Sequence, residues 1–305
     1  MARPAYTSPD CHAWECLGLG SVDGMQPPSA VELRRGVLAV SVLHDLDIEP
    51  AALGVTLTGE PTVWVSWGEC RRALAGHDPE TPDGRERLGR WLLARRWSAD
   101  LPLEDLRERL RPVGLPVDHL LHPGLDWVRR RALGDVLDLG LGAVDIDPGD
   151  PDHVVLLPTP LIDALGLDEQ VCWLEAEAYL DRMGALAAER LKLDPKGQLR
   201  PIGDCDVVTL LGSASLRAAI AERAGGMGAV VVPMRRRGWT DLTLIDPAFG
   251  PAAAAATPAA DRGFERPLLV TREEVALAVD GGTPERLALL EPAADPPWLR
   301  DTLYR

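Results

Sequence analysis

The sequence is poor in several residue types, and each shortage narrows what the protein could do. Only Lys192 and Lys196 are lysines, so nearly all of the 32 basic residues are arginines. Five cysteines spread over 305 residues do not predict a disulfide framework and favour a reducing compartment. The chain lacks the run of about 18 apolar residues that a transmembrane helix needs, and its start lacks the apolar core of a signal peptide. We therefore expect a cytoplasmic protein.

Basic residues are also fewer than acidic ones, 32 against 47, which gives a net charge of −15 at pH 7. An acidic surface repels the phosphates of nucleic acids and of anionic membranes. The basic stretches also lack interleaved aromatic residues and a lysine-rich arm, which are typical of proteins that bind nucleic acid. The composition thus predicts neither a nucleic-acid partner nor a membrane partner.

The charge is distributed unevenly along the chain. Residues 71–131 carry an excess of arginine, whereas residues 132–205 are strongly acidic. One interpretation is that the two segments form ion pairs with each other inside the same chain. The other is that the arginine-rich helices bind a protein partner or a second copy of the chain.

The pattern of apolar residues predicts an α/β protein in two parts. Residues 1–135 form an arginine-rich, mainly helical part with a short strand near 62–67, where "TVWVSW" alternates. Residues 136–305 form an α/β part that contains the clearest helix, over 168–194. No linker rich in serine and glycine separates the two parts, so they could also be one continuous domain.

The C-terminal part is expected to hold a mostly parallel sheet. The apolar run at 206–211 predicts a buried strand, followed by a helix over 214–224 and a second strand over 229–234. A strand at 267–270 then leads to a helix that begins at Thr271, with Glu274 completing a capping box. In the N-terminal part, Ser29 and Glu32 form another capping box, and a further helix is expected over 124–135.

This arrangement suggests a binding site for a small anion bearing phosphate or carboxylate. In a parallel sheet, the carboxyl ends of the strands lie at one edge, where ligands bind. A helix N-terminus, two serine hydroxyls and an arginine cluster would meet there. The candidate ligand-binding residues are Gly212, Ser213, Ser215, Arg235, Arg236 and Arg237.

Metal ligands and catalytic groups are less clear. Cys11, His12 and Cys16 are weak candidates for a zinc site, because no second cysteine pair follows them. His119 and His122 have the spacing of metal ligands, but prolines bracket the segment. We assign no metal and no cofactor.

Two classes of function remain open. The first is a protein that binds a small anionic ligand at the predicted edge, with no base or nucleophile that would identify an enzyme. A Gly-x-Ser-x-Gly elbow is absent. The second is a non-enzymatic interaction or structural protein that uses the arginine-rich helices 71–131, including a possible homo-oligomer.

Overall fold

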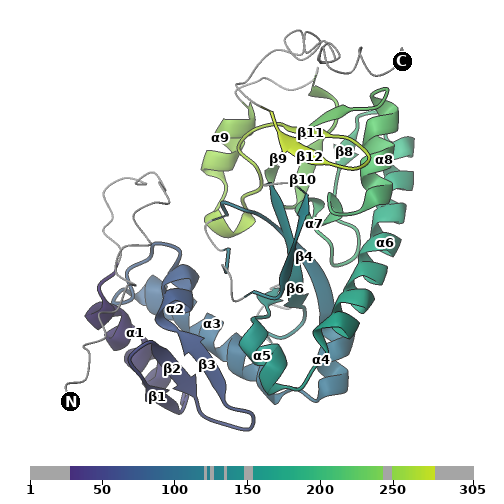
Figure 1. Ribbon diagram of the computed structural model, residues 1–305. Coiled ribbons are helices and arrows are strands. Elements are labelled where there is room, and N and C mark those ends of the chain that lie inside the picture. Colours follow the sequence, from purple (N-terminus) through teal and green to yellow (C-terminus); the bar gives the residue numbers. More distant parts are fainter. Residues whose placement is uncertain are drawn as a thin grey trace, which may run out of the picture.

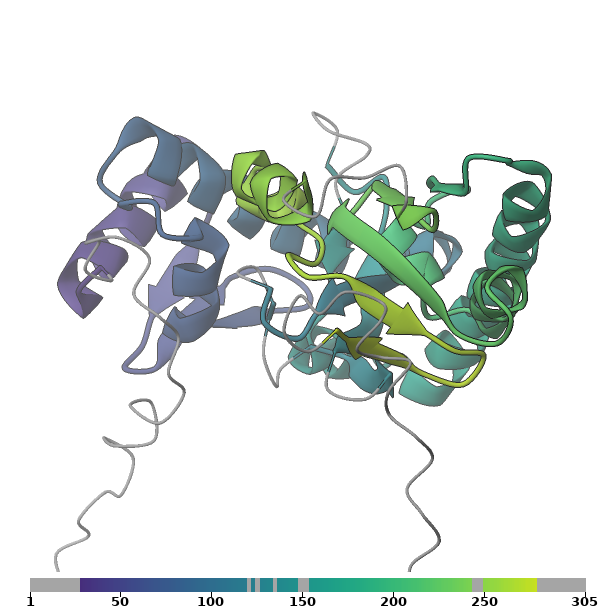
Figure 2. The same cartoon turned by 90° about the horizontal axis from the view of Figure 1, so that it is seen from above.

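The computed structural model describes residues 28–119, 122–123, 127–133, 136–147, 154–242 and 249–278 (Figure 1). Seen from above, the N-terminal elements form one end of an elongated molecule, and the helices Glu169–Leu193 and Ala214–Arg223 lie at the other end (Figure 2). Within the described ranges, no helix is both long and apolar enough to cross a membrane.

The N-terminal elements combine four helices with a small antiparallel sheet in the order β1-β2-β3. The elements are α1 (Ala30–Leu43), β1 (Ile48–Pro50), β2 (Gly54–Leu57), β3 (Val63–Ser66), α2 (Trp67–Leu74), α3 (Pro82–Asp100) and α4 (Leu103–Arg109). The expected capping box begins α1, because Ser29 and Glu32 exchange hydrogen bonds. The expected strand near 62–67 is β3.

A second antiparallel sheet follows, with the order β4-β6-β5 and with β7 paired to β6. Its strands are β4 (Leu110–Pro116), β5 (Arg129–Leu133), β6 (Leu137–Ala143) and β7 (Val155–Leu156). After β7 come α5 (Thr159–Ala164) and α6 (Glu169–Leu193). Helix α6 confirms the prediction over 168–194, and Asp168 accepts hydrogen bonds from its first backbone amides.

The C-terminal elements form a five-stranded sheet in the order β12-β11-β9-β10-β8. They are β8 (Gln198–Leu199), α7 (Val207–Leu210), α8 (Ala214–Arg223), β9 (Gly228–Met234), β10 (Arg237–Trp239), α9 (Phe249–Ala256), η3 (Ala259–Asp261), β11 (Leu268–Val270) and β12 (Val275–Leu277). Helix α9 lies against β9. Helix α8 lies beside α6, on the side of the molecule opposite to the N-terminal elements (Figure 1).

The prediction of a mostly parallel sheet is wrong. All strand pairs in the described part of the chain are antiparallel, in all three sheets. The protein is therefore a mixed assembly of helices and antiparallel sheets. The expected crossover from a strand at 206–211 to β9 does not exist.

The error arises at the apolar run 207–211. A short apolar run fits a buried helix as well as a buried strand. Here Asp206 decides the outcome, because its carboxylate accepts a hydrogen bond from the Thr209 backbone amide at 2.7 Å and begins α7. Two consecutive helices, α7 and α8, therefore precede β9.

Two further predictions fail for related reasons. Residues 129–133 within the expected helix 124–135 form β5, which pairs with β6. Thr271 and Glu274 do not begin a helix: they close the turn between β11 and β12, where the Glu274 amide donates to the Thr271 hydroxyl at 3.0 Å.

The hydrophobic core consists of two main clusters, and α6 contributes to both. Trp173 and Ala176 pack with the N-terminal helices, whereas Leu180 and Leu191 pack with α7, α8 and the five-stranded sheet. Strands on either side of residue 135 pair with each other. The proposed division into 1–135 and 136–305 therefore stays a prediction.

Close packing of α6 against the start of α8 depends on a glycine. A Cβ atom at Gly184 would lie 1.8 Å from the Ser213 hydroxyl oxygen. Ser213 is 1% exposed, and its hydroxyl has no hydrogen-bond partner among the residues that the structure describes. Ser213 therefore acts here as a packing residue at the N-terminus of α8.

We predict that Gly184→Ala destabilises the protein by about 1–3 kcal/mol, because the new methyl group forces the two helices apart. In a Ser213→Gly background the same change should be tolerated, since glycine at a helix N-cap costs only a few tenths of a kcal/mol. Urea unfolding of the double-mutant cycle measures this coupling. If Gly184→Ala instead stabilises the protein, as helix propensity alone implies, the contact is wrongly placed.

Candidate functional site

A cleft of about 770 Å³ lies between the N-terminal helices and the two larger sheets. Helices α2 and α3 line one side, and β4, β7, α7 and the turn between β9 and β10 line the other. Among the described residues, the arginines that line it are Arg72, Arg87, Arg90, Arg95, Arg111, Arg235 and Arg236. Its acidic residues are Glu69, Asp83, Glu86, Asp204, Asp206 and Asp261. In this lining the arginines slightly outnumber the acidic residues, although the net charge of the chain is −15.

Several of these arginines are held by carboxylates. Arg111 Nε lies 2.6 Å from Asp204 Oδ2, and Arg235 Nε lies 2.7 Å from Asp206 Oδ2. Asp206 also caps α7, so Arg235 is held at the start of that helix. These pairs fix guanidinium groups along the wall and leave them partly accessible.

Arg87 differs from them. Its Nε donates to the Ala73 carbonyl oxygen at 2.7 Å, which joins α3 to α2, and no described carboxylate lies within ion-pair distance of its guanidinium. Burial lowers its pKa, and no carboxylate is among the causes that act on it. Arg87 is therefore a partly desolvated cation that lines the cleft and has no counter-charge among the described residues.

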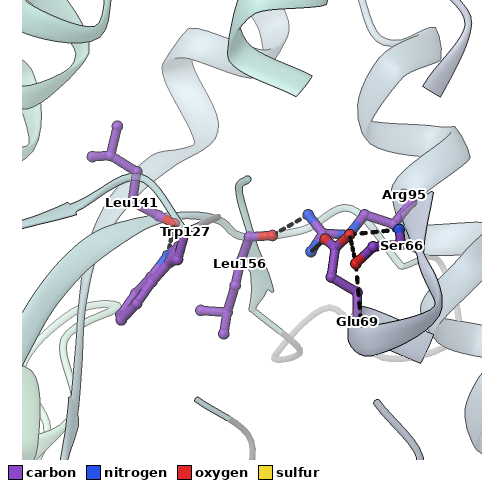
Figure 3. A network of polar contacts seen from close by, with 6 residues as sticks. All are labelled: Ser66, Glu69, Arg95, Trp127, Leu141 and Leu156. Atoms are coloured by element: carbon purple, nitrogen blue, oxygen red, sulfur yellow. Dashed lines mark hydrogen bonds and ion pairs between the residues drawn. The ribbon is translucent and has the colours of Figure 1, made fainter. Parts of the chain in front are cut away.

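A buried polar network forms the inner wall of the cleft (Figure 3). Arg95 donates to the Leu156 carbonyl of β7, and its Nη2 lies 3.7 Å from Glu69 Oε1. The other oxygen of Glu69 accepts hydrogen bonds from the amide and hydroxyl of Ser66, which complete the capping box of α2. Nearby, the Trp127 indole donates to the Leu141 carbonyl at 2.8 Å.

The burial of Arg95 is costly. Its side chain is 3% exposed. Desolvation lowers its pKa to about 10 although Glu69 acts in the opposite direction. At neutral pH Arg95 is still charged, so Glu69 is its essential counter-ion. The spacing of Arg87, Trp91 and Arg95, four residues apart, places all three along one side of α3.

The structure brings together only part of the predicted anion site. Arg235 and Arg236 line the cleft, whereas Gly212, Ser213, Ser215 and Arg237 are not among its lining residues. The carbonyls of Leu211 and Gly212 accept hydrogen bonds from Arg217, at 3.0 and 2.7 Å. Because 207–210 is a helix, the sheet edge that was expected to unite these residues is not formed.

The residues considered as metal ligands do not form a metal site in the described part of the chain. Cys11, His12 and Cys16 lie outside the described residues. His122 Nε2 lies 3.0 Å from Asp138 Oδ2, and Arg129 donates to the same oxygen. Within the described ranges, no group of three or more histidine, cysteine or acidic side chains is arranged to hold a metal ion.

The arginine-rich and acidic segments pair with each other. Ion pairs join residues 71–131 to residues 132–205 at several places along the molecule. They are Arg90–Asp147, Arg107–Glu175, Arg109–Asp145, Arg111–Asp204, Arg129–Asp138 and Arg130–Glu177. The interpretation of internal pairing is confirmed for these arginines, and a partner surface built on them would have to compete with these carboxylates.

Comparison of the chain with protein-family models, curated proteins and solved structures finds no significant match. The geometry of the cleft is therefore the basis for inferring a function.

We predict that Glu69→Gln destabilises the protein by about 3 kcal/mol, because it leaves Arg95 buried without a counter-charge. Glutamine can still form the capping box, so the loss isolates the ion pair. The matched control is Glu80→Gln, which removes an exposed pair with Arg35 at the same 3.7 Å separation and should cost under about 1 kcal/mol. Equal losses in chemical unfolding would contradict this assignment.

We also predict a loss of stability in acid that depends on His119. Burial, together with Arg235 and His122, lowers the pKa of His119 to about 4 from 6.5. The unfolded chain therefore binds a proton more readily between these values, and stability falls by up to about 1.4 kcal/mol per pH unit as the pH drops through this range. His119→Asn should reduce this slope in urea titrations, whereas His77→Asn, at an exposed position, should not.

Proposed function

We propose that the protein binds a small acidic molecule, carrying phosphate or carboxylate, in the arginine-lined cleft. The observation that carries this proposal is the state of Arg87. It is a partly desolvated cation, and no described carboxylate in the walls of the cleft pairs with it. Arg235 and Arg236, predicted from the sequence as anion ligands, lie on the opposite wall. An anionic group between the walls would neutralise Arg87 and gain charge-assisted hydrogen bonds.

The size and lining of the cleft support a small organic ligand. Its volume of about 770 Å³ lies within the range of about 300–1,000 Å³ that is typical of ligand sites. Val154 and Leu156, at and beside β7, are partly exposed and supply an apolar surface in the same cleft as the arginines. A ligand with an apolar body and at least one acidic group would fit both features.

None of the described cleft residues forms a pair of nucleophile and base, so we propose binding and assign no reaction. The described cysteines, Cys70, Cys172 and Cys205, are all free and buried, which agrees with the cytoplasmic location that we propose. A protein partner on residues 71–131 has less support, because many of their arginines are already paired.

We predict that the protein is stabilised by phosphates or carboxylates in a thermal-shift screen and that Arg87→Gln removes most of this effect. A ligand at a hundredfold excess over its Kd stabilises the folded state by about 2.7 kcal/mol, which raises the Tm by several degrees. The control, Arg35→Gln, removes one exposed arginine outside the cleft and should leave the shift unchanged.

The screen should include inorganic phosphate, sugar phosphates, nucleotides, aliphatic and aromatic carboxylates, and neutral sugars. If no anion shifts the Tm, or if both variants respond as the wild type does, the cleft is not an anion site.

A further inference from the structure

The residue next to Arg87 on the same side of α3 indicates which chemical group the ligand carries besides its acid. Trp91 lines the cleft, is only partly buried, and packs at its inner side against the first hydrophobic cluster. It follows Arg87 by one helical turn, so the two side chains are neighbours. An aromatic ring thus lies beside a cation that no carboxylate in the described part of the chain neutralises.

The Trp91 ring is held in place by its other neighbour on the helix. The Arg95 guanidinium carbon lies 5.1 Å from the centre of the indole ring. Arg95 in turn is fixed by the Leu156 carbonyl and by Glu69. A ring that is already ordered before a ligand arrives loses little rotamer freedom on binding, which favours its use as a stacking surface.

The remaining apolar residues of the cleft suit a flat ligand. Val154 and Leu156, at and beside β7, line the cleft and are only partly buried, so they can supply an aliphatic surface to a ligand. A planar ring can contact an indole and such a surface with a large share of its area, whereas a flexible aliphatic chain would lose more entropy.

From this arrangement we infer that the ligand carries a planar aromatic ring that stacks on Trp91 while its acidic group binds Arg87. This inference rests on the proposed function and goes beyond it by naming the body of the ligand. Two sources share this chemistry, a nucleoside phosphate and an aromatic carboxylic acid, and the probes below distinguish them.

The test is calorimetric titration of the full chain with two matched pairs of probes. Adenosine monophosphate is compared with ribose 5-phosphate, and benzoate is compared with cyclohexanecarboxylate. We expect the aromatic member of at least one pair to bind about tenfold or more tightly than its non-aromatic partner, which is within the range measured for stacking on aromatic side chains. Whichever pair shows the preference identifies the source.

Variants at position 91 connect the preference to the ring. Trp91→Leu should abolish the aromatic preference and leave the affinity for the non-aromatic probes within about threefold. Trp91→Phe keeps an aromatic ring packed against the core and is the control for a folding defect. It should retain part of the preference for the aromatic probes. Quenching of tryptophan fluorescence by the aromatic probe should also be smaller in Trp91→Phe than in the wild type.

The outcomes separate the two proposals. Equal, Arg87-dependent binding of aromatic and non-aromatic acids overturns the inference about Trp91 but leaves an acid-binding cleft. An aromatic preference that persists in Trp91→Leu also overturns it. The absence of Arg87-dependent binding by every probe overturns both proposals.

Discussion

The contact of Arg95 with Glu69 and with the Leu156 carbonyl is the constraint on which the cleft depends. It joins the consecutive helices α2 and α3 to β7, a strand distant from them in the sequence, at one buried point. A buried guanidinium tolerates few alternative positions, because moving any partner leaves a desolvated charge. The N-terminal helices are therefore fixed against the second sheet, and the space above this point remains open as the cleft.

The structure explains the uneven distribution of charge along the sequence, because the arginine-rich and acidic segments form ion pairs with each other. Most carboxylates that pair with the arginine-rich segment lie on β6, α6 or the connections beside them, such as Asp138 and Glu175. These pairs neutralise arginines over much of the molecule. Inside the cleft the balance differs, because Arg87 turns its Nε to a backbone carbonyl instead of a carboxylate. Internal pairing and an anion site are thus compatible explanations of one composition.

Local signals predicted the elements that depend on local chemistry. The capping box at Ser29 and the long apolar stripe after Asp168 were sufficient for α1 and α6. Sheet pairing was not predictable in this way. Strand β4 contains two prolines and a glycine, and it forms because it is an edge strand that pairs with β6 on one side. Likewise, only its pairing with β6 makes the arginine-rich segment 129–133 a strand.

The residues of the candidate site were also only partly predictable from the sequence. Arg235 and Arg236 were predicted as anion ligands through a parallel sheet that does not exist, yet both face the cleft. Arg87 was missed because what distinguishes it is that no described carboxylate pairs with it, and this is a property of the folded chain. Asp83 and Glu86 lie close to it in sequence, but neither forms an ion pair with it. Since the bond to Ala73 holds its Nε toward α2, the cation is kept from the acids of its own helix. A positive charge held in this way is stabilised most by an anion that enters from outside the chain.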